Sequence, residues 1–366
     1  PNLKLIDTEK FLAVICGRID FKFLEASKKI ILSPGLSKSQ IGINLLVEFP
    51  EKVISDIDLF SAYCRSPIIG VTGTNGKTTV TTIISSMLSL AGYNVLSGGN
   101  IGEPALNLLS QTVPDFYILE LSSFQLELFQ QVKLEIGVLL NISPDHLDRH
   151  ESFSRYIRIK HRILECSKRA IVDKYGSFVE IAKICPSPVF FSLDMPKENH
   201  YGLKKCNDDI YYSRGEDSFC SVKNTSEMGV HNQLNFLAAI AACDVAVGFN
   251  SKMTMAIKNF KGLPHRIEEI TTLSEVTFFD DSKATNIAAA EAGIRACLTP
   301  CGGVLILGGI FKGGDVKNLV KLIAENVHTV ILIGESANYF FKLFALKTKC
   351  DFASNMSEAV MKAKKS

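Results

Sequence analysis

The chain has 366 residues, of which 46% are hydrophobic and 21% charged, a balance that excludes disordered, collagen-like and coiled-coil proteins. Its length suits two or three domains. Lys and Arg number 40 against 38 Asp and Glu, so the net charge of +2 gives no field that favours nucleic acid or an anionic membrane. Scattered cysteines without a CxxC pair predict reduced thiols and a cytoplasmic protein. The sequence contains no continuous apolar run of about 18 residues, so we expect no membrane span.

Short runs rich in Ile, Val and Leu alternate with helical patterns, which predicts an α/β fold with buried parallel strands. Strands are expected, in chain order, at residues 3–6, 29–32, 68–72, 116–119, 136–141, 170–172, 277–280, 303–307 and 329–333. Helices are expected at 79–90 and 287–297. Alternating patterns between Cys206 and Val222 predict antiparallel strands. Domain boundaries are expected near 55–67 and at 261–264, where Gly and Pro end a helical pattern.

The strongest motif lies between the strand 68–72 and the helix that follows it. It contains Gly73-Thr74-Asn75-Gly76-Lys77-Thr78-Thr79. Backbone N–H groups at a helix start bind anions, a lysine adds charge for phosphates, and the hydroxyl of Thr78 can hold Mg²⁺. The usual phosphate-loop template has Gly where Val71 stands, so the match is to a shorter form. The alternative is a Gly-rich turn with an exposed lysine, which the flanking strand and helix disfavour.

Two further polar segments directly follow predicted strands. Glu120 ends the strand at 116–119 and can reach a cation held by Thr78, although a lone carboxylate is more often solvated. His146 and His150 are four residues apart, but no HExxH motif is present, so we expect a polar network rather than a zinc site. Either histidine alone is equally well explained as a helix cap or a surface residue.

The segment Asp280-Asp281-Ser282-Lys283-Ala284-Thr285-Asn286 connects the strand 277–280 to the helix 287–297. Adjacent carboxylates with hydroxyl, amine and amide groups at a strand-to-helix turn are typical of a functional site. Asp, Ser and Thr are also the ordinary helix-capping residues. The composition of the segment leaves both interpretations open.

Together these motifs resemble the Mur ligase family over nearly the whole chain. The family features are residues 73–79, 141–148, 231–235 and 263–268. The branch that adds D-glutamate is favoured by 33–35, 98–102, 120–125 and above all 281–286. The resemblance implies a three-domain α/β architecture, with a UDP-substrate domain at 1–56, a central phosphate-loop ATPase domain at 57–262 and a Rossmann-like amino-acid domain at 263–366.

The resemblance implies an enzyme of peptidoglycan synthesis, and hence of cell-wall biogenesis, cell shape and cell division. ATP and Mg²⁺ would serve to phosphorylate the carboxylate of UDP-N-acetylmuramoyl-L-alanine, and the amine of D-glutamate would attack the acyl phosphate. It also implies a cytoplasmic monomer that neither binds nucleic acid nor inserts into a membrane. The alternatives are another Mur-type or folylpolyglutamate-type amide ligase and a decayed, non-catalytic nucleotide-binding fragment.

The resemblance also implies roles for individual residues. The catalytic residues are Lys77, His146, Lys160, Lys283 and Lys312. The magnesium ligands are Thr78, Glu120, His146 and Lys160. The nucleotide contacts are Gly73, Thr74, Asn75, Gly76, Lys77, Thr78, Thr79, Asn232, Asn235, Arg266 and Asp281. The substrate contacts are Asp7, Thr8, Ser33, Pro34, Gly35, Asn100, Ser122, Gln125, His146 and Thr285. Lys160 matches the lysine that the family carbamylates; judged without the family it would be a surface lysine on a helix.

Three departures from the family pattern concern the substrate ends. Glu9 stands where the family often has Arg, which removes one expected phosphate contact. The family's opening strand, glycine loop and helix have no counterpart before Pro1, and its final segment with a Ser and a Phe has none after Ser366. From these departures we expect both outer domains to be truncated and the chain as given to be a poor catalyst.

Overall fold

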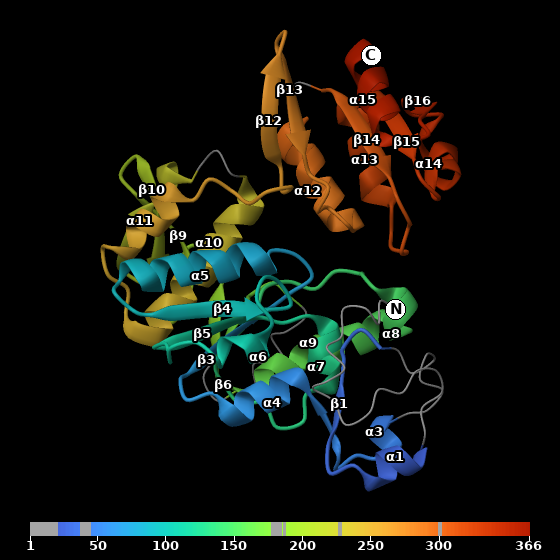
Figure 1. Ribbon diagram of the computed structural model, residues 1–366. Coiled ribbons are helices and arrows are strands. Elements are labelled where there is room, and N and C mark those ends of the chain that lie inside the picture. Colours follow the sequence, from blue (N-terminus) through green and yellow to red (C-terminus); the bar gives the residue numbers. More distant parts are fainter. Residues whose placement is uncertain (1–20, 37–44, 177–184, 186–187, 226–228, 299–301) are drawn as a thin grey trace.

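The computed structural model describes residues 21–36, 45–176, 185, 188–225, 229–298 and 302–366. They form three bodies in chain order (Figure 1). The first body contains α1 (Phe21–Ala26), α3 (Leu45–Glu48) and a parallel pair of strands, β1 (Ile30–Leu32) and β2 (Val53–Ser55). This pair confirms the strand predicted at 29–32. The strand predicted at 3–6 and the residues Asp7 and Thr8 lie outside the described residues.

The second body is built on a nine-stranded sheet in the order β11-β10-β9-β8-β7-β6-β3-β5-β4. Its strands are β3 (Ile68–Thr72), β4 (Val95–Gly99), β5 (Phe116–Glu120), β6 (Leu134–Leu139), β7 (Ser167–Asp173), β8 (Pro188–Phe191), β9 (His200–Cys206), β10 (Asp209–Arg214) and β11 (Asp217–Ser221). Neighbouring strands are parallel from β4 to β9 and antiparallel from β9 to β11. The α/β fold is confirmed, as are the parallel strands predicted here and the antiparallel strands predicted between 206 and 222.

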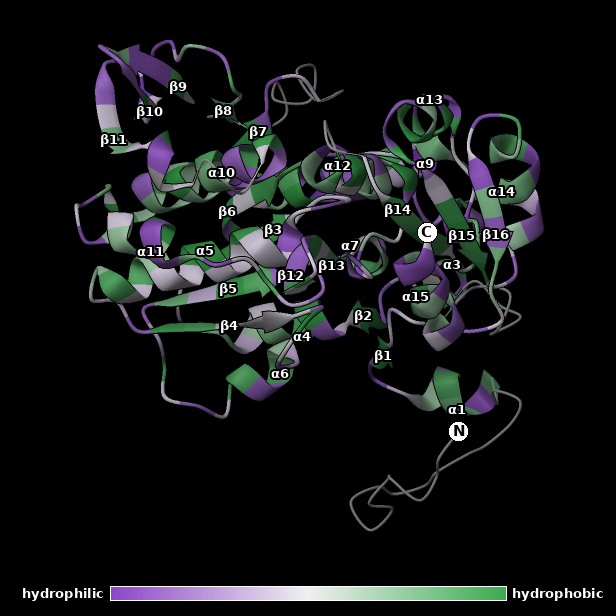
Figure 2. Cartoon of the chain, turned by 90° about the horizontal axis from the view of Figure 1, so that it is seen from above, coloured by the Kyte–Doolittle hydropathy of each residue, from purple (hydrophilic) through white to green (hydrophobic). Residues whose placement is uncertain are grey.

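Helices cover both faces of this sheet, because side chains of a strand point alternately to its two sides. Ile69 and Val71 of β3 pack on one face in a core shared with α5 (Lys77–Leu90), α10 (Val230–Val247) and α11 (Met253–Asn259). Ile68 packs on the other face with α4 (Asp56–Tyr63), α6 (Ala105–Leu108), α7 (Ser123–Leu128) and α9 (Phe153–Glu165). The central strands are therefore mostly hydrophobic along their length (Figure 2).

Helix α10 is the single helix of the described ranges that is long and apolar enough to cross a membrane by length and composition. Its residues from Phe236 to Cys243 are all buried against the sheet and α5. Packing in the core therefore accounts for the apolar character of α10.

The third body contains a hairpin, β12 (Glu268–Leu273) and β13 (Val276–Asp280), and a parallel sheet of β14 (Val304–Gly308), β15 (Thr329–Ile333) and β16 (Lys349–Phe352). The helices are α12 (Ile287–Cys297), α13 (Lys317–Asn326), α14 (Ala337–Phe344) and α15 (Met356–Lys365). The helix predicted at 287–297 is confirmed. The strand predicted at 277–280 is present as β13, but it is not buried or parallel, because Ser274 and Glu275 both adopt positive φ and close an antiparallel hairpin whose side chains are largely exposed.

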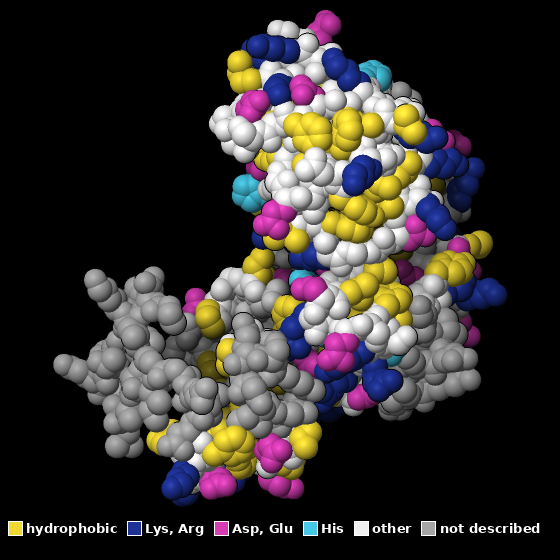
Figure 3. Space-filling view, turned by 90° about the vertical axis from the view of Figure 1, so that its right-hand side faces the viewer, with side chains coloured by type: hydrophobic (Ala, Val, Ile, Leu, Met, Phe, Trp, Pro, Cys, Tyr) yellow, Lys and Arg dark blue, Asp and Glu magenta, His cyan; other side chains and the backbone are white. Residues whose placement is uncertain are grey.

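The third body has one smaller core, in which Val330 and Leu332 of β15 are fully buried beneath α13 and α14. Its outer surface carries many exposed apolar side chains, among them Phe341, Leu346 and Phe352. Hydrophobic side chains accordingly gather on the face shown in Figure 3. The second body, with its two cores, is thus the better-packed part of the described chain.

Replacing Phe236 with Ala should destabilise the second body strongly. Phe236 is fully buried, and its ring centroid lies 5.7 Å from that of Phe260 and 6.1 Å from that of Tyr212. The cavity should lower the free energy of unfolding by about 3–5 kcal/mol in urea denaturation. Val230→Ala on the same helix, where the side chain is 60% exposed, should change it by less than about 0.5 kcal/mol. Equal losses in the two variants would contradict this packing.

Candidate active site

A tight loop connects β3 to α5 and has the shape expected of a phosphate loop. Gly76 precedes the helix with a φ of 84°, a conformation that favours glycine. A Cβ atom at Gly76 would lie 2.4 Å from Oδ1 of Asn235, and one at Gly73 would lie 2.9 Å from Cβ of Leu140. The loop therefore needs both glycines, and the first backbone N–H groups of α5 are free to meet an anion.

Hydrogen bonds from the chain after β6 fix this loop. Oδ1 of Asn141 accepts from the backbone N–H of Asn75 at 2.9 Å, and its Nδ2 donates to the carbonyl of Asn75 at 3.0 Å. The backbone N–H of Ser143 donates to Oγ1 of Thr74 at 3.0 Å, and the hydroxyl of Tyr156 lies 3.1 Å from the same oxygen. The loop is thus held in place before any ligand binds. Sequence reasoning did not find Tyr156, which comes from α9.

Two lysines lie at this loop. Nζ of Lys77 donates to the carbonyls of Gly73 and Thr74 at 3.0 and 2.9 Å, and burial lowers its pKa while Glu120 opposes the shift. Nζ of Lys160 donates to the same Gly73 carbonyl at 2.9 Å. Burial, reinforced by the charge of Lys77, lowers the pKa of Lys160 well below its ordinary value.

Lys160 is therefore not the surface lysine that its helical context suggests. Its side chain is 1% exposed and reaches the loop from α9. Burial disfavours the charged form of this amine, and the uncharged form of an amine is the nucleophilic one.

Glu120 lies beside the loop, as predicted, rather than in solvent. The side chain of Glu120 is 2% exposed. Its Oε2 accepts a hydrogen bond from Oγ1 of Thr78 at 2.9 Å, and its Oε1 accepts one from Nδ2 of Asn100 at 2.8 Å. Nη2 of Arg266 donates to the same Thr78 hydroxyl at 3.1 Å. Carboxylate and hydroxyl oxygens suit Mg²⁺, so Thr78 and Glu120 together fit that ion.

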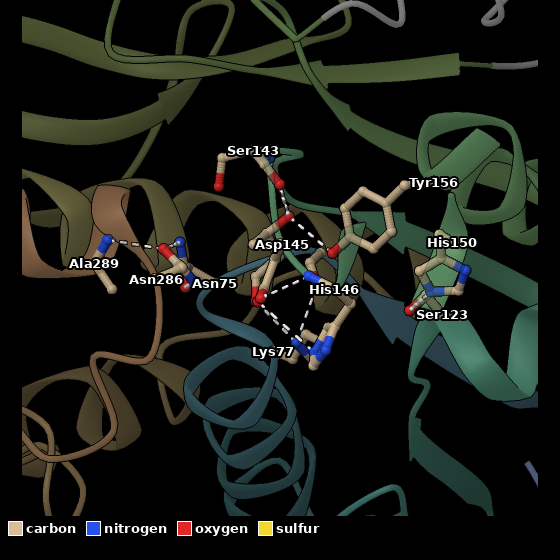
Figure 4. Close-up of polar contacts among 12 residues, drawn as sticks. Asn75, Lys77, Ser123, Ser143, Asp145, His146, His150, Tyr156, Asn286 and Ala289 are labelled. Carbon is tan, nitrogen blue, oxygen red and sulfur yellow. Dashed lines mark hydrogen bonds and ion pairs between the residues drawn. The ribbon is translucent and has the colours of Figure 1, made fainter. Parts of the chain in front are cut away.

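His146 precedes α8 (Leu147–His150) with a φ of 52°. Its backbone N–H donates to Oδ1 of Asp145 at 2.9 Å, and its Nε2 lies 3.8 Å from Oδ2 of the same residue (Figure 4). Burial lowers the pKa of His146, Asp145 opposes this, and the charge of Lys312 lowers it further. His146 is therefore close enough to both Lys77 of the loop and Lys312 of the third body for their charges to affect its pKa.

His150, at the end of α8, belongs to the predicted polar network. It is fully buried, with Nε2 2.9 Å from Oγ of Ser123, and burial lowers its pKa to about 4. The neighbouring Arg149 contacts Glu127 at 3.2 Å. The rings of His146 and His150 both lie against the ring of Phe124, with centroid distances of 5.0 and 5.2 Å, and neither belongs to a group of three or more possible metal ligands among the described residues.

A cavity of about 290 Å³ opens beside the loop, between the second and third bodies. Predicted nucleotide contacts line it, namely Asn75, Gly76, Thr79, Asn232, Asn235, Arg266 and Asp281, together with Lys283. Nδ2 of Asn235 donates to Oδ1 of Asn232 at 3.1 Å. Phe191 and Phe260 also line the cavity and offer apolar surface to a planar ring. Sequence analysis missed these two, since single phenylalanines carry no motif.

The segment 280–286 proves to be both a cap and part of the cavity wall. Oδ1 of Asn286 accepts from the backbone N–H of Ala289 at 3.0 Å and caps α12, while Asp281 and Lys283 line the cavity. Burial raises the pKa of Asp281 to about 6, although its hydrogen bond from the N–H of Ile267 opposes the shift. Thr285 is exposed on the same turn.

The remaining predicted substrate contacts lie apart from the loop. Ser33, Pro34 and Gly35 follow β1, and the next residue, Leu36, accepts from Nη2 of Arg149 at 3.3 Å. Ser122 and Gln125 form a reciprocal cap at the start of α7. The structure thus gives Ser122 and Gln125 a structural role, and their substrate role stays a prediction.

Comparison with known proteins places these observations in context. Residues 71–243 match the Mur ligase middle domain. The chain is 36% identical to a UDP-N-acetylmuramoylalanine–D-glutamate ligase of Nitrosococcus oceani, covering 99% of this chain and 81% of that protein. It is 38% identical to the ligase of the same name from Saccharophagus degradans, covering 95% and 77%. The fold resembles that of the MurF ligase of Thermotoga maritima, solved with ADP, with a TM-score of 0.62, 17% identity and coverage of 94% and 90%.

Gly76→Ala should weaken nucleotide binding measured by calorimetry with ADP, because the new methyl group would displace Asn235 and strain the loop. We expect affinity to fall at least about 10-fold, since one strained or displaced contact costs of order 1–3 kcal/mol. Gly92→Ala is the matched control at the other end of α5, where φ is 101° and no atom lies within 4 Å of the added Cβ. Unchanged ADP affinity in Gly76→Ala would contradict the loop assignment.

Asp281→Asn should flatten the pH dependence of stability. A carboxyl with a raised pKa stabilises the folded state below its unfolded pKa of about 3.9, and that contribution is lost as the pH rises through its folded pKa of about 6. Urea midpoints between pH 4 and 7 should therefore decline less in the variant. Asp280→Asn is the control, because a hydrogen bond with His265 lowers the pKa of Asp280 to about 2, outside that window. A decline identical to wild type in Asp281→Asn would exclude this titration.

Proposed function

The chain belongs to the Mur ligase family, and on that premise we propose that it joins D-glutamate to UDP-N-acetylmuramoyl-L-alanine with conversion of ATP to ADP and phosphate. The observation that carries the proposal is that the fixed loop and the segment from Asp281 to Lys283 line one cavity, while the buried Glu120 and Lys160 hydrogen-bond to the same loop and the start of α5 from behind it. Ligases of this name share about a third of their residues with the chain.

At the phosphate end, the backbone N–H groups of the loop and the amine of Lys77 would hold the outer phosphates of ATP. Phosphoryl transfer between two anions needs chiefly positioning and positive charge. Thr78 and Glu120 would hold Mg²⁺, which when bound neutralises phosphate charge. Arg266, already hydrogen-bonded to Thr78, would add a second cation from the third body. The role of this end is to bring the ATP phosphate and the substrate carboxylate together.

The buried amine of Lys160, whose pKa is lowered by its burial, is suited to a second task. A neutral buried amine can add CO₂ and lose a proton to give a carbamate, which would supply an oxygen where Lys160 now meets the loop. His146 would lie on the same side.

The third body would present the amino-acid acceptor. Lys283 lines the cavity, and the charge of Lys312 lowers the pKa of His146, so both residues lie near the loop. Lys283, Thr285 and Lys312 would orient the carboxylates of D-glutamate so that its amine lies within attack distance of the acyl phosphate. We assign the three functions to domains at 1–56, 57–262 and 263–366, in a cytoplasmic monomer.

The test is phosphate release with ATP, Mg²⁺, UDP-N-acetylmuramoyl-L-alanine and each of several amino acids. Release that depends on D-glutamate supports the proposal. Release that appears only when UDP-N-acetylmuramoyl-L-alanine is replaced by UDP-N-acetylmuramate with alanine, or by UDP-N-acetylmuramoyl-L-alanyl-D-glutamate with 2,6-diaminopimelate, would assign the chain to another ligase of the family. ADP binding without release under any condition would favour the non-catalytic alternative.

Lys77→Ala should lower ligation by about 10²–10³-fold, the usual cost of removing one group that stabilises transition-state charge. The fold should survive, because the side chain contacts loop carbonyls rather than a core. Lys168→Ala, which removes a lysine that is 75% exposed, is the control and should retain wild-type turnover. Retained turnover in Lys77→Ala would refute the phosphate-loop role.

Lys160→Ala should be nearly inactive and should regain part of its turnover in millimolar acetate or formate. A small carboxylate can occupy the space of the carbamate and offer the same oxygen ligand. Lys160→Met, which fills that space, should be inactive without rescue. Full activity of Lys160→Ala in the absence of carboxylate would show that the side chain has no catalytic task.

A further inference from the structure

Two asparagine side chains connect the phosphate loop to the third body. Nδ2 of Asn286 donates to Oδ1 of Asn75 at 2.9 Å, and Nδ2 of Asn75 donates to Oδ1 of Asn286 at 3.3 Å. The two residues are 211 positions apart in the chain. The pair therefore uses a donor and an acceptor of each amide in a single reciprocal contact (Figure 4).

Each member of this pair makes further hydrogen bonds within its own body. The peptide of Asn75 is hydrogen-bonded on both sides by the side chain of Asn141. Oδ1 of Asn286 also caps α12 through the backbone N–H of Ala289. A displacement of either element would thus be transmitted through the amide pair to the other, because Asn141 fixes the peptide of Asn75 and the Asn286 side chain cannot rotate away without also losing its contact with Ala289.

The position of Asn286 gives the contact a functional meaning. Asn286 ends the turn that carries Asp281 and Lys283 into the nucleotide cavity and exposes Thr285. The turn is otherwise anchored within its own body, by the hydrogen bond from the N–H of Lys283 to the carbonyl of His265. The Asn75–Asn286 pair thus relates this turn directly to the phosphate loop, beside the hydrogen bond from Arg266 to Thr78 at the start of α5.

We infer that Asn75 and Asn286 are positioning residues that set the distance between the phosphate loop and the acceptor-binding turn. The inference rests on the proposed function for its kinetic consequence, since a misplaced turn would hold the acceptor amine out of reach of the acyl phosphate. Neither amide needs to touch the reacting atoms. Small displacements suffice, because attack requires the two reactants to lie about 3–3.5 Å apart.

The key variant is Asn286→Ser. Serine caps helices as well as asparagine does, so α12 should remain intact, but its shorter side chain cannot reach Asn75. We expect the KM for D-glutamate to rise about 10-fold and kcat to fall, in line with coupling between contacting residues, while the KM for ATP changes less than twofold. Asn286→Ala, which removes the cap as well, should show the same kinetic change and a lower melting temperature.

A double-mutant cycle with Asn75→Ala separates positioning from independent structural damage. If the two amides act as one contact, the double variant should have the same D-glutamate KM as the more impaired single variant. Multiplied effects, or wild-type kinetics in Asn286→Ser, would overturn the inference.

A second measurement does not depend on turnover. Small-angle X-ray scattering of the same proteins without ligands should show a larger radius of gyration in each single variant and no further increase in the double variant. If the wild-type protein releases no phosphate in response to D-glutamate, the proposed function is refuted. The scattering result would then test the inference by itself. Unchanged radii in both single variants would refute it.

Discussion

The whole site depends on the two hydrogen bonds between the side chain of Asn141 and the peptide groups of Asn75. Asn141 holds both the N–H and the carbonyl of Asn75, and it can do so because β6, which precedes it, pairs directly with β3, which precedes the loop. The carboxyl ends of neighbouring parallel strands meet at one edge of the sheet. From this fixed peptide follow the direction of Lys77, the start of α5 and the placement of the Asn75 side chain toward the third body.

Local sequence signals sufficed for much of this arrangement. The apolar run at 68–72, the glycines of the loop and the alanine-rich helix at 287–297 each specify structure through neighbours close in the chain. The pairing of Thr78 with Glu120 was also predictable, because both residues end strands or begin helices at the same sheet edge. These features combine local conformation with a general rule of α/β topology.

Other features arise from packing between distant segments and could not be predicted in the same way. The helical pattern around Lys160 is that of a surface helix, yet the approach of α9 to the loop buries the amine. The hairpin of β12 and β13 turns at Ser274 and Glu275, which lack the Asn or Gly typical of such turns. Tyr156, Phe191 and Phe260 acquire their roles only from the cavity that surrounds them.

Helix α10 joins two tasks that are usually separate. Its first turns carry Asn232 and Asn235 to the cavity, and the residues from Phe236 onward lie in the core. The same helix therefore contacts the ligand and packs in the core. A bound nucleotide would stabilise the folded second body through mass action. At a nucleotide concentration 100 times its dissociation constant, this linkage adds about 2.7 kcal/mol to the free energy of unfolding. Nucleotide occupancy would thus govern the resistance of the second body to unfolding as well as the rate of turnover.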